Sequence, residues 1–154
     1  VVFYGWIWSM ERGIHPLVQD ELKLKPISFK VSFIFTVTYI SLLFLTLFAL
    51  GMLILPERLV DEETSKTIEP LYGAFIPLIN AFHIIEVFCT IYCFYHAAKT
   101  IKMAEKKRPV KFWDYAGEFF MIWFFHFGVW VLQPKLNALY EANLNTSNTD
   151  LPEA

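Results

Sequence analysis

An uninterrupted apolar segment from Val31 to Leu55 constrains this chain more than any other feature. The segment contains no charged residue and is followed directly by Pro56 and Glu57. A helix needs about 20 residues to cross a hydrocarbon core of about 30 Å, so this segment is long enough to span a membrane. Backbone groups inside lipid must be paired within the protein, which leaves helices or closed barrels. A continuous apolar run without alternation favours a helix.

Two further segments are also long enough to cross a bilayer, at about 71–98 and 115–133. Residues 1–9 are apolar as well but too short to cross alone, and we expect them to be the end of a further span. The sequence therefore predicts an all-α fold. Its architecture is an integral membrane helical bundle of three full transmembrane helices, at about 31–55, 71–98 and 115–133, plus the end of a truncated fourth at the N-terminus.

Composition also indicates that lipid is the solvent. Hydrophobic residues make up 56% of the 154-residue chain, whereas soluble domains contain about 45–50%. The formal net charge of -2 gives no reason to expect nucleic acid as a partner. Cys89 and Cys93 lie four apart in one apolar segment and are interpreted as small apolar packing residues. We expect one transmembrane helical domain over 1–142 and a flexible polar tail over 143–154.

Basic residues are distributed unevenly among the polar connections. Residues 10–30 carry four and residues 99–113 carry six, whereas residues 57–69 carry two among several acidic residues. Short loops rich in Lys and Arg stay cytoplasmic. Loops 10–30 and 99–113 are therefore predicted to be cytoplasmic, with loop 57–69 and the C-terminus external. The basic residues of the last loop could also contact anionic lipid; these are Lys102, Lys106, Lys107, Arg108 and Lys111.

The 71–98 segment carries a polar stripe within its apolar sequence. At helical periodicity, five side chains share one face: Asn80, His83, Glu86, Thr90 and Cys93. His83 and Glu86 are three residues apart and can therefore meet. An ionisable residue inside a membrane is costly and often marks a functional site. The stripe supports two interpretations, namely a proton or cation site, or a buried pair that joins helices by hydrogen bonds.

The 115–133 segment contributes two more polar residues on one face, Glu118 near its start, where it could pair with a basic residue of the adjoining loop, and His126 near its middle. Together with His83 and Glu86 they form the candidate intramembrane polar site. The two histidines could bind a haem iron, or share a metal with the carboxylates. Bulky phenylalanines surround His126, however, and leave little room for haem. We therefore predict no cofactor, leave the metal open and assign no catalytic residue.

Three stretches carry a resemblance to a known group: WIWSMERGIHPLVQ, PISFKVSFIF and GEFFMIWFFHFGVWVLQPKLN. In these stretches the chain resembles small multi-pass membrane proteins of Bacteroidota-type bacteria, a group to which no activity is assigned. The resemblance covers most of the chain and rests mainly on hydrophobic motifs. It implies four helices and a bacterial inner membrane, and it carries over no catalytic residue.

The leading functional interpretation is a non-enzymatic accessory or scaffold subunit that packs against a larger membrane complex or transporter. Its expected partners are the lipid bilayer and either other membrane subunits or further copies of itself. The alternative is a proton- or metal-handling membrane protein that uses the intramembrane His and Glu residues. A membrane enzyme acting on lipid, using the same groups, also stays open.

Overall fold

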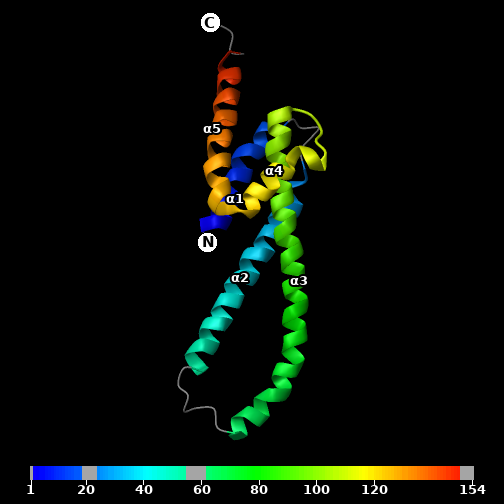
Figure 1. Ribbon diagram of the computed structural model, residues 1–154, viewed down its shortest axis with the longest axis vertical. Helices are drawn as coiled ribbons and strands as arrows, with labels where there is room; N and C mark the ends of the chain where they lie inside the picture. The colour runs from blue at the N-terminus through cyan, green and yellow to red at the C-terminus, as the bar shows by residue number, and fades with distance from the viewer. Residues whose placement is uncertain (1, 19–23, 55–61, 150–154) are drawn as a thin grey trace. The chain divides into compact units, whose positions relative to one another are not determined.

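The computed structural model describes residues 2–18, 24–54 and 62–149, and these contain helices and no strand (Figure 1). The all-α fold class is therefore confirmed. The elements are α1 (Val2–Ile14), the short 3-10 helix η1 (His15–Leu17), α2 (Pro26–Ile54), α3 (Glu62–Lys106), α4 (Phe112–Trp123) and α5 (Phe125–Thr149).

The chain divides into two compact units, where the sequence predicted a single domain over 1–142. The hairpin unit is Lys30–Ile91 and holds most of α2 with the first part of α3. The bundle unit combines Val1–Phe29 with Tyr92–Ala154 and holds α1, the end of α3, α4 and α5.

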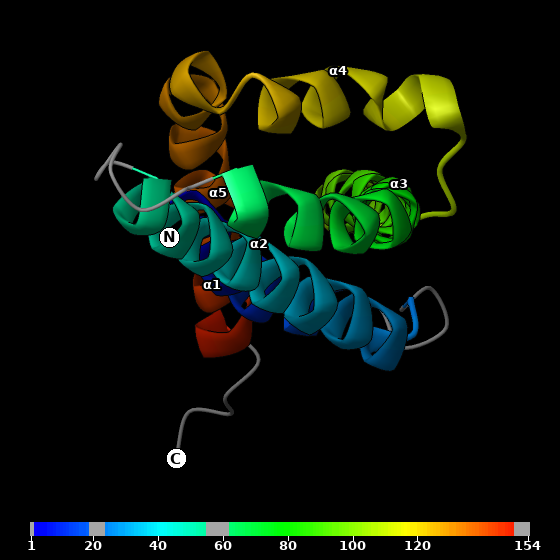
Figure 2. The ribbon, with the colours of Figure 1, turned by 90° about the horizontal axis from the view of Figure 1, so that it is seen from below.

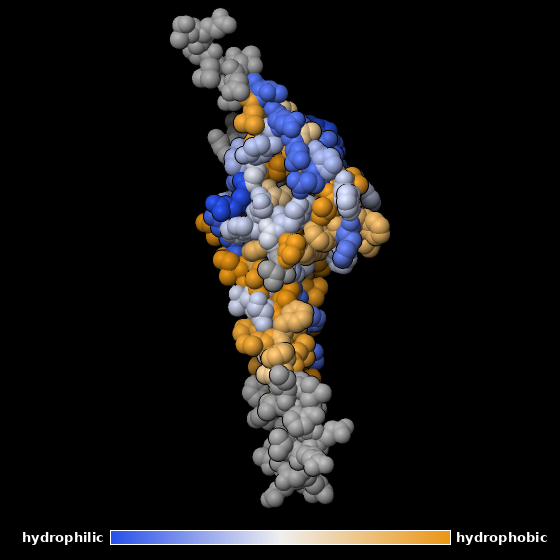
Figure 3. Space-filling view, turned by 90° about the vertical axis from the view of Figure 1, so that its left-hand side faces the viewer, coloured by the Kyte–Doolittle hydropathy of each residue, from blue (hydrophilic) through white to orange (hydrophobic). Residues whose placement is uncertain are grey.

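Two helical segments are long and apolar enough to cross a membrane, Pro26–Ala49 and Ile76–Lys106, among the residues that the structure describes. They correspond to the predicted spans at 31–55 and 71–98. In the most apolar 18-residue stretch of each segment few residues are covered, since only 6% of the first stretch and 11% of the second are buried. Large hydrophobic side chains of both segments are accordingly exposed, and hydrophobic side chains gather on the face shown in Figure 3.

α3 is longer than its predicted span at both ends. Residues 62–69, expected in a polar loop, already belong to it, while residues 55–61 lie outside the described part of the chain. Residues 99–106, also expected in a loop, continue it to Lys106. Polar composition does not end a helix by itself, and acidic residues at a helix start are favoured by the helix dipole. Charge therefore indicates where the apolar segment ends, not where the helix ends.

The end of α3 forms the centre of the bundle unit. Most of its residues from 93 to 104 are buried: Cys93, Phe94, His96, Ala97, Ala98, Thr100, Ile101, Met103 and Ala104. Aromatic rings join it to the other helices. The Phe3 ring centroid lies 5.7 Å from that of Phe94 and 4.7 Å from that of Phe125. This part of α3 is thus covered by protein, in contrast to its first part.

The predicted third span at 115–133 is not one continuous helix. α4 ends at Trp123 and α5 begins at Phe125, with Phe124 between them at φ -90° and ψ 57°. α5 then lies across the direction of α4 (Figure 2). The turn brings the two backbones together so closely that a Cβ on Gly128 would lie 1.7 Å from the Met121 carbonyl oxygen. The three-span bundle is therefore not confirmed.

The end of the chain also differs from expectation. Gln133 and Pro134 were expected to close the third span, but α5 continues through Pro134 to Thr149. Residues 143–149 are helical where a flexible tail was predicted, and 150–154 lie outside the described residues. After Pro134 the sequence contains no Gly or Pro until Pro152, so no helix breaker interrupts this stretch.

Gly128→Ala is expected to destabilise the bundle unit, because the new Cβ would collide with the backbone of Met121. Overpacking of this kind costs about 1–3 kcal/mol or more. Thermal unfolding in mild detergent measures the effect. Gly117→Ala is the matched control, since nothing lies within 4 Å of its added Cβ, and it should leave the midpoint unchanged or higher. Equal midpoints for the two variants would refute the close approach.

Candidate functional site

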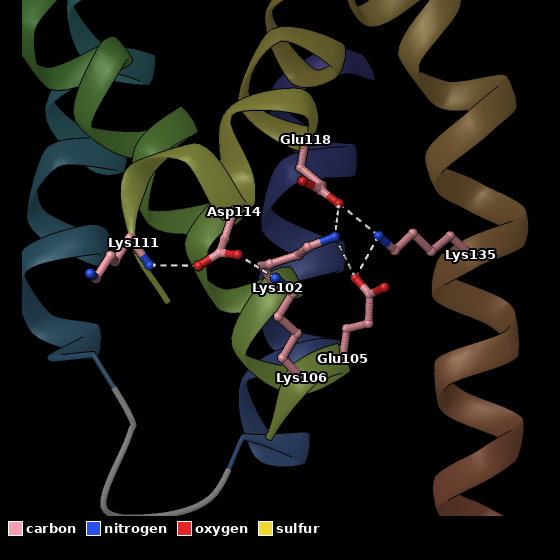
Figure 4. Close-up of polar contacts among 7 residues, drawn as sticks. All are labelled: Lys102, Glu105, Lys106, Lys111, Asp114, Glu118 and Lys135. Atoms are coloured by element: carbon pink, nitrogen blue, oxygen red, sulfur yellow. Dashed lines mark hydrogen bonds and ion pairs between the residues drawn. The ribbon is translucent and has the colours of Figure 1, made fainter. Parts of the chain in front are cut away.

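Glu118 lies in a ring of alternating charges that joins three helices of the bundle unit (Figure 4). Its Oε1 accepts hydrogen bonds from Lys102 Nζ at 3.0 Å and from Lys135 Nζ at 2.6 Å. Both ammonium groups also pair with Glu105 Oε2, at 2.9 Å and 2.6 Å. Two positive and two negative charges balance, which is what a buried carboxylate requires.

The ring explains why α4 stays beside the end of α3. Lys102 and Glu105 come from α3, Glu118 from α4 and Lys135 from α5. Lysine side chains reach such partners with their ammonium groups while their stems cover apolar surface. The sequence placed Glu118 in a site with His126 and also suggested a basic partner from the adjoining loop. Lys102 confirms the second suggestion. Lys135 was missed because it follows the predicted span.

A second contact holds the start of α4. The Lys106 ammonium donates to Asp114 Oδ1, and the Lys111 backbone N–H donates to Asp114 Oδ2 at 3.0 Å. The hydrogen bond from Lys106 is the main reason that the pKa of Asp114 lies below its ordinary value of 3.8, and the Lys111 N–H adds to it. Asp114 thus favours the helix start both by hydrogen bonding and by its charge.

His83 and Glu86 meet within the hairpin unit, but only one of them is buried. His83 Nδ1 lies 4.0 Å from Glu86 Oε2, and 56% of the His83 side chain is exposed against 8% for Glu86. Glu86 accepts a hydrogen bond of 2.7 Å from Thr90 Oγ1, one turn further along α3. The ring of Tyr39 lies 6.0 Å from that of His83. Asn80, which belongs to the same stripe, is exposed.

The four residues of the predicted polar site belong to different units. His83 and Glu86 are in the hairpin unit, whereas Glu118 and His126 are in the bundle unit. His126 is exposed, and its ring lies 5.8 Å from that of Phe125. Within residues 2–18, 24–54 and 62–149, no group of three or more His, Cys, Asp and Glu residues could hold a metal ion.

A buried acid–histidine pair was missed by the sequence reasoning. Glu11 of α1 and His96 of α3 are 6% and 0% exposed, and His96 Nδ1 lies 3.2 Å from Glu11 Oε1. The pair forms no hydrogen bond, and the described part of the chain supplies no other hydrogen-bond partner for either side chain. Helical spacing was the available signal, because Glu11 shares the buried face of α1 with Ile7 and Ile14.

The five basic residues predicted to contact anionic lipid separate into two groups. Lys102 and Lys106 are engaged by Glu118, Glu105 and Asp114. Lys107, Arg108 and Lys111 have exposed side chains in the turn between α3 and α4. Only the second group is free to meet a charge from outside the chain.

Glu118→Gln is expected to destabilise the bundle unit, because Lys102 and Lys135 would share the one carboxylate of Glu105. Hydrogen bonds to charged groups contribute about 1.5–3 kcal/mol, so the unfolding midpoint in mild detergent should fall clearly. Glu141→Gln removes the same charge from an exposed position of α5 and serves as the control. If both variants unfold like the wild type, the ring does not hold these helices together.

Asp114→Asn is expected to lower stability in a pH-dependent way. The lowered pKa of Asp114 in the folded chain means that its ionised form stabilises the fold above about pH 4. That contribution is lost as pH falls through the folded pKa. Unfolding midpoints of both proteins between pH 7 and pH 2 should therefore differ at neutral pH and converge in acid. A difference that stays constant across this range would contradict the assignment.

The described side chains thus provide a neutral ring of four charges, a helix-start pair, and two acid–histidine pairs. The ring and the helix-start pair hold α3, α4 and α5 together. Comparisons with protein-family models, with curated proteins and with solved structures give no match for this chain.

Proposed function

We propose that this chain is an integral membrane protein with a non-enzymatic role, an accessory or scaffold subunit whose hairpin unit packs in the bilayer. The observation that carries this proposal is the exposure of apolar side chains around α2. Leu42, Leu45 and Leu47 are all more than half exposed although they point to different sides of the helix. A helix that is apolar all round is either the core of a large protein or a membrane span.

The low burial of α2 favours the second explanation. A core helix would be covered by its own protein, whereas only 6% of the most apolar 18-residue stretch within Pro26–Ala49 is buried. Leaving that surface in water would be unfavourable by about 25 cal/mol per Å². Hydrocarbon or the helices of other chains would cover it without such a cost. The length of the segment also matches the thickness of a bilayer core.

The hairpin unit also offers a surface suited to packing. An apolar groove of about 350 Å³ lies between α2 and α3, lined among others by Phe35, Tyr39, Leu42, Leu78, Ile79 and Phe82. Inside a membrane such a groove is filled by lipid chains or by another helix. The proposed partners are therefore the bilayer and further membrane subunits, or copies of this chain.

The basic loops set the proposed orientation in a bacterial inner membrane. Residues 10–30 and 99–113 carry most of the Lys and Arg and are placed in the cytoplasm, with loop 57–69 outside. A third span at 115–133 would put the C-terminus outside as well. Since α4 is a separate 12-residue helix, we place α5 on the cytoplasmic side with the basic loops.

A second candidate function is proton handling, and the Glu11–His96 pair favours it. Both side chains are buried without a hydrogen-bond partner among the described residues, and at 3.2 Å a reorientation of either group would let them share a proton. Reconstituted vesicles distinguish the two functions. Proton movement by the purified protein that is abolished by Glu11→Gln, with folding retained, would replace the accessory role by a transport role. Absence of proton movement supports the accessory role.

The proposal predicts that the protein stays in the membrane after alkaline carbonate extraction. Replacing Leu45 and Phe48 by Asp should weaken this retention, because an Asp at the centre of a membrane helix costs about 2.5–3.5 kcal/mol. Ala138→Asp, at an exposed position of α5, should leave retention unchanged. Release of the wild-type protein by carbonate would overturn the membrane assignment.

A further inference from the structure

α4 is too short to cross a membrane. Its 12 residues extend over about 18 Å at 1.5 Å per residue, against a hydrocarbon core of about 30 Å. The break at Phe124 and the close approach at Gly128 prevent α5 from extending it in the same direction. α4 is therefore a separate helix and not part of a membrane-spanning helix.

The two faces of α4 differ strongly. One face is buried in the bundle unit through Tyr115, Glu118 and Ile122. The other face is aromatic and uncovered, with Trp113 87% exposed and Phe120 54% exposed. These two residues lie seven apart, which is two helical turns, so they share one side. An exposed aromatic face on a short amphipathic helix is typical of helices that lie in the membrane interface.

A cluster of exposed positive charge precedes this face. α3 ends at Lys106, and Lys107 has a positive φ of 48°, which turns the chain toward α4. The exposed Lys107, Arg108 and Lys111 follow within this turn, and the described residues supply no salt bridge to any of them. Three cations beside an exposed tryptophan match the border between lipid headgroups and hydrocarbon.

We propose that α4 and the turn at 107–111 form an interfacial binding site for anionic phospholipid. Lys107, Arg108 and Lys111 bind the headgroup phosphate, while Trp113 and Phe120 enter the adjoining hydrocarbon. Charge complementarity selects an anionic occupant, and the aromatic face selects a lipid over free phosphate. The inference rests on the membrane location proposed above and adds to it the chemistry of one partner.

The test uses the purified full chain in mild detergent, with phosphatidylglycerol or phosphatidylcholine added to the micelles. Phosphatidylglycerol should raise the unfolding midpoint of the wild type more than phosphatidylcholine does. The triple variant K107Q/R108Q/K111Q should lose most of this difference. The control R12Q/K25Q/K30Q removes the same charge from other exposed positions and should retain the difference between the two lipids.

Inorganic phosphate should not replace the lipid. Equal lipid responses in both triple variants, or full stabilisation by phosphate, would overturn the site.

A second measurement does not depend on stability. A nitroxide label at Trp113→Cys, in a chain lacking Cys89 and Cys93, reports depth in phosphatidylglycerol vesicles through its collisions with oxygen and with a water-soluble nickel complex. The label should lie at the interface, and free access to the nickel complex would refute the inference. If the protein resists carbonate extraction but fails this test, only the proposed lipid site is refuted. If carbonate releases the protein, the proposed membrane location itself is refuted.

Discussion

The buried carboxylate of Glu118 determines how the last three helices can be arranged. A buried charge needs partners close by, and those of Glu118 are Lys102 on α3 and Lys135 on α5. α4 must therefore lie where both lysines reach it, which requires the chain to turn sharply before α5. Gly128 permits that turn, because no larger residue fits against the Met121 carbonyl. The aromatic face of α4 is left uncovered as a consequence.

α3 changes its environment along its length. Between Ile76 and Phe88 most of its apolar side chains are exposed, whereas between Cys93 and Ala104 most are buried. The first stretch suits hydrocarbon, and the second is covered by the helices of the bundle unit. One continuous helix thus connects a hairpin proposed to cross the bilayer with a bundle that carries paired charges. Because the helix continues from one environment into the other, the end of the apolar segment predicted from hydropathy is not the end of α3.

The helical fold class and two long apolar helices could be predicted from the sequence. A long apolar run suits lipid, and in lipid the backbone groups must be paired within the segment, which a helix achieves. The break at Phe124 could not, since no proline or glycine lies between Gly117 and Phe124 and the contacts that fix the break are distant in sequence. Glu118 was correctly selected as unusual, but its partner Lys135 is visible only once α5 has turned. The pairing of Glu11 with His96 likewise joins two helices, and periodicity could have indicated only that Glu11 lies on a buried face.

The central claim is that two helices cross the membrane and that α4 and α5 do not. Single cysteines at Lys107 and Glu141, in a chain lacking Cys89 and Cys93, test this with a membrane-impermeant thiol reagent in intact cells. A cysteine at Glu62 serves as the external control and should be labelled. The account predicts that positions 107 and 141 both stay unlabelled until the membrane is opened. Labelling at 141 without labelling at 107 would show that the chain crosses again after α3 and would contradict it.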